Sequence, residues 1–166
     1  MIALAQKLTA IVTKMTALYD SFRITLIQEQ ELLVANKTTE LKECVDNKNR
    51  LAESIASAEE QRLAAVIEAS NSMGVKGRMA KFEEIALLAG TSGKELMTAR
   101  GVLLDVVGKV KALNAVNEQL LNDSMNYIKT AFELVTGKQN RNCGYAMNGM
   151  TKSSVAVKRN LVNMQA

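Results

Sequence analysis

The sequence predicts an all-α protein, on three observations. The 166-residue chain contains no proline, the residue that most often interrupts a helix. Alanine, leucine, lysine, glutamate and glutamine dominate, and these residues lose little free energy on entering a helix. Apolar residues also recur at steps of three, four and seven. We therefore predict an elongated antiparallel bundle of three long helices, with one short connecting helix and a flexible C-terminal tail.

The first two long helices are predicted to form a hairpin. Apolar residues on one heptad line, from Leu4 to Leu32, indicate a helix from Ile2 to Ala35. The pattern breaks at Asn36–Thr39, where a threonine is expected to cap the next helix. That second helix carries its apolar line as far as Ile67. Because the connection is so short, the two helices should be antiparallel.

A loop and a short helix should lead into the third long helix. Glycine, serine and asparagine predict a loop over Ser70–Gly77, and apolar spacing predicts a helix over Arg78–Ala89. Ser92 and Glu95 form a capping-box signature for the start of the third helix. Gly137 is expected to end that helix as its C′ residue.

The third helix should be longer than its neighbours. At about 1.5 Å per residue, the first helix would measure roughly 50 Å and the third roughly 65 Å. An overhang at its C-terminal end would expose Ile128, Phe132, Leu134 and Val135. Exposed apolar surface of this kind typically marks a partner site.

Polar residues interrupt the apolar stripes. Asn114 and Asn117 stand within the stripe of the third helix, where apolar residues would pack better. Glu29 and Lys48 similarly interrupt the first and second helices, at similar distances from the turn of the hairpin. Both sets can be interpreted as polar seam residues that fix the register of packed helices, with Glu29 and Lys48 forming an ion pair.

Charge divides the chain into a helical region, residues 1–137, and a basic tail, residues 138–166. The tail has five basic residues and no acidic one, which leaves residues 1–136 with 16 basic and 17 acidic side chains. Such a tail can bind nucleic acid, anionic lipid or an acidic protein surface, or can simply keep the protein soluble. No signal-length or membrane-length apolar run occurs, so we expect a cytoplasmic protein.

The sequence offers no catalytic or metal-binding constellation. It contains no histidine and only two cysteines, Cys44 and Cys143, which is too few of the usual soft ligands for a zinc site. A nucleophile paired with histidine is excluded for the same reason. We expect no enzyme activity, no metal and no cofactor.

The order of several short motifs resembles the FlgN family of flagellar type III export chaperones. These motifs are Glu29-Gln-Glu-Leu-Leu, Lys48-Asn-Arg-Leu51, Glu59-Glu-Gln-Arg62, Leu113-Asn-x-x-Asn117-x-x-Leu120-Leu121 and the tail segment Tyr145-Ala-Met-Asn-Gly149. The resemblance covers about residues 15–149. It implies two antiparallel helices, a variable loop, a long third helix and a flexible tail.

The resemblance also implies partners and sites. Members bind the hook–filament junction proteins FlgK and FlgL before export, and use neither ATP nor a cofactor. The client-binding residues would be Asn114, Asn117, Leu120, Leu121, Ile128, Leu134 and Val135. The tail would dock on the cytoplasmic domain of the export gate protein FlhA through Tyr145 and Gly149. From the residues alone, Tyr145 could equally pack on its own bundle.

The residues also permit two other classes of function. Periodicity alone also permits a coiled-coil scaffold or adaptor without a role in secretion. The basic tail permits a nucleic-acid binder, although the tail has one aromatic residue, Tyr145, and no recognition motif, so nucleic acid is the weaker alternative.

Overall fold

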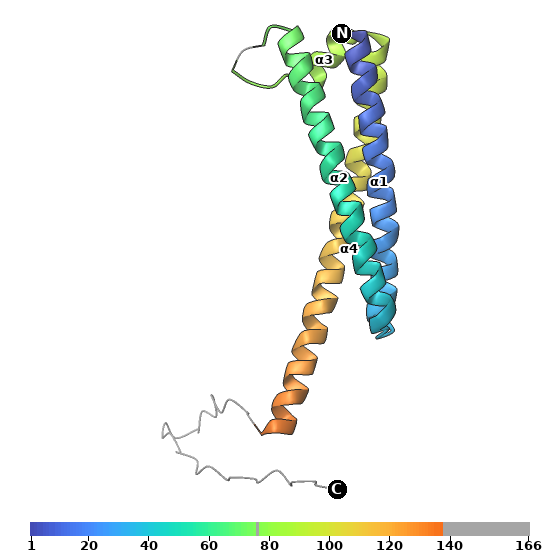
Figure 1. Cartoon of the computed structure of the whole chain (residues 1–166), viewed down its shortest axis with the longest axis vertical. Coiled ribbons are helices and arrows are strands. Elements are labelled where there is room, and N and C mark those ends of the chain that lie inside the picture. The colour runs from blue at the N-terminus through green and yellow to red at the C-terminus, as the bar shows by residue number, and fades with distance from the viewer. Residues whose placement is uncertain (76, 138–166) are drawn as a thin grey trace, which may run out of the picture. The chain divides into compact units, whose positions relative to one another are not determined.

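The computed structural model describes residues 1–75 and 77–137, and these residues are all helical or loop, without a strand. The helices are α1 (Ile2–Val34), α2 (Thr38–Ser72), α3 (Phe82–Ala89) and α4 (Thr91–Thr136) (Figure 1). The all-α prediction is confirmed. By its contacts the chain divides into two units, Met1–Tyr127 and Ile128–Ala166, which are described separately.

Helices α1 and α2 form the predicted antiparallel hairpin. Lys7 Nζ lies 2.6 Å from a carboxylate oxygen of Glu68, so the start of α1 is beside the end of α2. Near the turn, Asn47 Nδ2 donates to Thr25 Oγ1 at 3.3 Å. The turn itself uses Asn36 with φ +53°, a left-handed conformation that asparagine tolerates better than most residues.

The predicted threonine cap is wrong. Thr38 is the first residue of α2, Lys37 takes the N-cap position, and no side chain caps the helix there. Helix α2 also continues to Ser72, beyond the start of the predicted loop at Ser70. The reason lies in Ser70 itself, which is buried, donates to Val66 O at 2.7 Å and accepts from the Ala80 N–H at 2.8 Å. Its hydroxyl therefore satisfies polar groups inside the fold.

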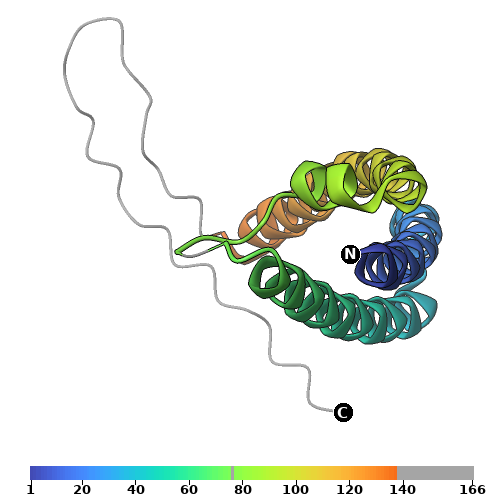
Figure 2. The ribbon, with the colours of Figure 1, turned by 90° about the horizontal axis from the view of Figure 1, so that it is seen from above.

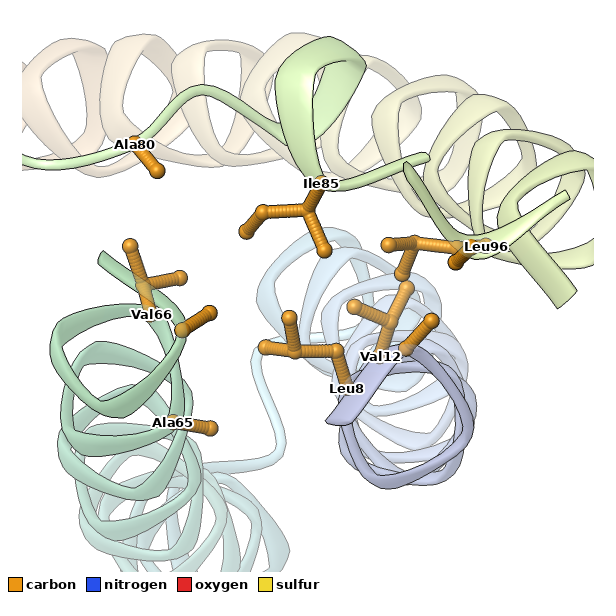
Figure 3. Packing of buried hydrophobic residues seen from close by; sticks show 10 residues of the cluster. Leu8, Val12, Ala65, Val66, Ala80, Ile85 and Leu96 are labelled. Atoms are coloured by element: carbon orange, nitrogen blue, oxygen red, sulfur yellow. The ribbon is translucent and has the colours of Figure 1, made fainter. Parts of the chain in front are cut away.

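The apolar core of the first unit gathers at the end where α1 begins and α2 ends (Figure 3). Leu8 and Val12 of α1 face Val66 of α2, Ile85 of α3 and Leu96 of α4. Full burial of such side chains contributes roughly 1.5–3 kcal/mol each. Small residues complete the cluster and let the helices approach closely. They are Ala5, Ala65, Ala69, Ala80 and Ala89.

Helix α3 begins at Phe82 and is shorter than the predicted Arg78–Ala89, because polar interactions fix the residues before it, with Lys81 in an extended conformation. The Arg78 guanidinium donates to both carboxylate oxygens of Glu84, at 2.7 and 2.6 Å. One of these oxygens also accepts the Lys81 N–H at 2.8 Å. The Arg78 guanidinium and the Lys81 N–H hold the pKa of Glu84 down to about 2.

The start of α4 is fixed by a close approach to α3. A Cβ atom on Gly93 would lie 2.0 Å from the carbonyl oxygen of Ala86, so glycine is required there. Helix α4 begins at Thr91, and Ser92 is inside the helix and buried, so the predicted N-cap role of Ser92 is wrong. Gly137 follows the last helical residue with φ +67°, as predicted for a C′ glycine.

Within the first unit, α1 lies between α2 and α4 (Figure 2). Leu96 of α4 joins the core cluster beside Val12, and Asn117 contacts Leu26 further along α1. Over this part α4 therefore runs in the same direction as α1. The elongated arrangement of three long helices and the boundary at residue 137 stay predictions.

Candidate functional site

One face of α4 packs on α1 and is here called the seam face. Its residues recur at steps of three and four, which places them on one side of the helix. Leu96, Val110 and Asn117 are buried, and the residues between and after them are partly buried. The seam face comprises Leu96, Ala99, Leu103, Val106, Val110, Leu113, Asn117 and Leu120.

A polar cluster joins three helices at Asn117. The Asn117 side-chain amide donates to the carbonyl oxygen of Leu26 at 2.8 Å and to a carboxylate oxygen of Glu29 at 2.9 Å. Lys48 of α2 donates to the other oxygen of Glu29 and forms an ion pair with it. The Glu29 side chain is 2% exposed and that of Lys48 23%. The predicted ion pair between Glu29 and Lys48 is thus confirmed.

The cluster satisfies almost all of its buried polar groups. Ion pairing compensates the desolvation of Glu29, and removing one partner of a buried pair typically costs about 3–5 kcal/mol. The exception is Asn117 Oδ1, which is buried without a hydrogen-bond partner among the described residues. A group of this kind costs roughly 1–3 kcal/mol. The unpaired Oδ1 therefore offsets much of the stability that the two hydrogen bonds of the Asn117 amide contribute.

A second apolar face lies beside the seam face on α4 and is here called the outer stripe. It comprises Leu121, Met125, Ile128, Phe132 and Val135, at alternating steps of four and three. In the first unit, Leu121 and Met125 are exposed, Met125 to 66%. In the second unit, Ile128, Phe132 and Val135 are exposed, Val135 to 83%. Runs of exposed apolar side chains are a common property of interaction surfaces in proteins.

Comparison with known proteins decides the family. The family model described as FlgN protein matches residues 1–153, nearly the whole chain. The chain belongs to the FlgN family. A Bacillus subtilis (strain 168) relative, described as uncharacterized protein YvyG, is 27% identical over 118 residues, which cover 70% of this chain and 72% of the relative. No solved structure matches.

Membership of the FlgN family assigns the coarse function. The family consists of flagellar export chaperones that bind hook-associated proteins, and it is not an enzyme family. The outer stripe is a surface that a helical chaperone can offer to an apolar client segment.

Among the described residues, no group of three or more histidine, cysteine or acidic residues could hold a metal ion. Burial, with a further effect of Glu29, raises the pKa of the Cys44 thiol, which makes this thiol a poor nucleophile. None of the helices in residues 1–75 and 77–137 combines the length and hydropathy of a membrane span.

The structure places the predicted client-binding residues in two environments. Asn117 is buried and Leu120 partly buried on the seam face, whereas Asn114 is exposed. Leu121 and Ile128 lie on the outer stripe, as does Val135, and Leu134 beside it is also exposed. The predicted gate-binding residues, Tyr145 and Gly149, lie outside the described residues.

Sequence reasoning missed Met125 and Tyr127, both of which are exposed on α4. Met125 follows Leu121 by four residues and precedes Ile128 by three, so the spacing of the outer stripe would have found it. Tyr127 lies seven residues after Leu120, on the continuation of the seam face. The same counting along α4 would have included it.

Proposed function

We propose that the chain is a cytoplasmic export chaperone for hook–filament junction proteins of the FlgK and FlgL type, which it delivers to the flagellar export gate. The observation that carries this proposal is the outer stripe of α4, a row of exposed apolar side chains on a long helix. A chaperone needs such surface to cover the apolar face of a client until export.

Binding would follow the helix-to-helix mode of recognition, in which anchors recur at steps of three and four. Each large side chain of the outer stripe would contribute roughly 1.5–3 kcal/mol when a client helix buries it fully. The proposed client surface comprises Asn114, Leu120, Leu121, Ile128, Leu134 and Val135. It also includes Asn117, which is buried beside them.

The proposal includes the finer features of the fold. The three long helices would form an elongated antiparallel bundle over residues 1–137, and residues 138–166 would form a separate basic tail. Tyr145 and Gly149 in that tail would contact the cytoplasmic domain of an FlhA-type gate. The client and the gate would then bind different parts of the chain and could be held together.

The test replaces two residues of the outer stripe with aspartate. Ile128→Asp with Val135→Asp puts two charges where apolar contact is expected, and affinity for a peptide from the C-terminal helix of a FlgK or FlgL protein should fall at least about tenfold. Both side chains are exposed, so helix content measured by circular dichroism should stay unchanged. Titration calorimetry measures the affinity.

A matched control adds the same charge to the polar side of α4. Gln119 and Asn122 are exposed, and Gln119→Asp with Asn122→Asp should leave peptide affinity within about twofold of the original, since rim substitutions have small effects on affinity. If the stripe variant stays folded and binds the peptide as well as the control does, the client site is elsewhere.

A coiled-coil scaffold is the second candidate, because the four-three spacing of the outer stripe also suits self-association. Sedimentation equilibrium distinguishes the two: a scaffold would form a stable oligomer through α4 that a client peptide does not dissociate. The basic residues of the tail keep a nucleic-acid binder as a weaker third candidate, which would bind DNA with a steep dependence on salt.

A further inference from the structure

Two of the proposed client residues, Asn117 and Leu120, belong to the seam face that α1 now covers. A client cannot reach Asn117 while its amide is bonded to α1, because only 1% of Asn117 is exposed. The seam face could therefore bind a client only if part of α4 leaves the hairpin. Three features of the first unit favour such a movement.

The first feature is the firm attachment of α4 at its start. Leu96 is fully buried in the core cluster, and Gly93 lies against the backbone of Ala86. Beyond Leu96, the buried residues of α4 among those described are Val110 and Asn117. Asn117 is the only buried residue of α4 after Val110 among those described, and it is held by polar contacts.

The second feature is that the hairpin stays satisfied when Asn117 leaves. Glu29 keeps its ion pair with Lys48, which comes from α2. The Leu26 carbonyl keeps its place in the hydrogen-bond ladder of α1. The Asn117 amide and its unpartnered Oδ1 would both gain water. An apolar residue at this position would instead lose contacts on separation and would hold α4 more tightly.

The third feature is a pair of glycines between Leu96, where α4 is firmly attached, and Val110, the next buried residue of α4. Gly101 and Gly108 lie within α4, one heptad apart, and a Cβ atom on either would meet nothing within 4 Å. Packing therefore does not require glycine there. Glycine inside a helix weakens it, so this part of α4 is the natural place for bending.

We propose that α4 bends near Gly101 and Gly108 and releases its seam face from Val110 onward, so that a client helix takes the place that α1 occupies. The chemistry of this client helix follows from that of α1, whose place it would take. The client helix is amphipathic, with apolar residues at steps of three and four and a carboxylate or carboxamide level with Asn117, in the position of Glu29. The opening is independent of the proposed function, whereas the identity of the occupant rests on it.

Opening is measured by the distance between spin labels on α2 and α4. Asn49 and Glu118 are exposed, and cysteines placed there in a Cys143→Ser background carry the labels, while the native Cys44 is buried. The full chain without any client should give a main distance and a second, longer one. Addition of a peptide from the C-terminal helix of a FlgK or FlgL protein should increase the longer population.

Two variants should favour the closed state, in which the seam face of α4 lies on α1. Asn117→Leu removes the buried unpartnered oxygen and should reduce the longer population at least about fivefold. Gly101→Ala with Gly108→Ala should also reduce it, through a stiffer helix. Asn122→Leu is the matched control, because Asn122 is exposed on α4 outside the proposed client surface and the substitution should leave the distances unchanged.

The outcomes separate the two proposals. A single distance in the unsubstituted chain, with and without peptide, would overturn the opening of α4, and so would an Asn117→Leu variant with unchanged populations. If the helix opens as expected but no peptide of this class increases the longer population, the opening stands and the proposed client is wrong. If it opens and Asn117→Leu weakens peptide binding at least about fivefold, both are supported.

Discussion

At the scale of single residues, the ion pair between Glu29 and Lys48 shows why polar residues can occupy a helix seam. Each charge is acceptable inside the hairpin because the other is present, and Asn117 supplies a further donor to Glu29. The Coulombic gain of such a pair roughly balances its desolvation. Its main effect is to make other registers of α1 against α2 unfavourable.

We predict that Lys48→Met destabilises the protein by about 3–5 kcal/mol, because it leaves the Glu29 carboxylate buried with no cation. The double variant Lys48→Met with Glu29→Met should recover most of that loss, since two apolar side chains replace the pair. Urea unfolding followed by circular dichroism measures both. Equal destabilisation by the single and the double variant would contradict the prediction.

At the scale of the helices, the sequence predicted an element correctly where its apolar residues recur at regular steps. Helix α1 and the length of α4 follow from apolar spacing, and Gly137 ends α4 as expected. The errors lie at helix ends, where a single tertiary contact decides. The burial of Ser70 extends α2, and the pairing of Arg78 with Glu84 shortens α3. Local sequence does not contain these contacts.

The glycines of α4 have opposite roles that spacing alone does not distinguish. Gly93→Ala should destabilise the protein by about 1–3 kcal/mol, because its Cβ would meet the Ala86 backbone. Gly101→Ala has open space around it and should stabilise by about 0.5–1 kcal/mol. Thermal unfolding of the two variants checks both signs, and a loss of stability for Gly101→Ala would mean that α4 has an unrecognised contact there.

At the scale of the whole molecule, the candidate site was predictable from sequence only in part. The steps between Ile128, Phe132 and Val135 place them on one face, and their exposure confirms the expectation of exposed apolar surface at this end of α4. That a client binds there stays a prediction. The environment of Asn117 was not decided by sequence, because a seam residue and a client contact have the same spacing. Only the contact with Leu26 and Glu29 assigns Asn117 to the interior.

The whole chain is proposed to bind a client through α4 and the export gate through Tyr145 in its basic tail. The ring of a tyrosine buries a large apolar area, and its hydroxyl retains a hydrogen bond at an interface. Tyr145→Ala should therefore weaken association of the client-loaded chaperone with the cytoplasmic domain of an FlhA-type gate at least about tenfold. Client affinity and melting temperature should not change.

Two further variants separate this role from a structural one. Tyr145→Phe keeps the ring and should retain part of the gate affinity, whereas Asn142→Ala, in the same tail, should have no effect on it. If Tyr145 instead packed on its own bundle, Tyr145→Ala would lower the melting temperature, since burial of an aromatic side chain stabilises the fold. A clear fall in melting temperature with unchanged gate binding would therefore assign Tyr145 to the fold and leave the gate contact to other residues.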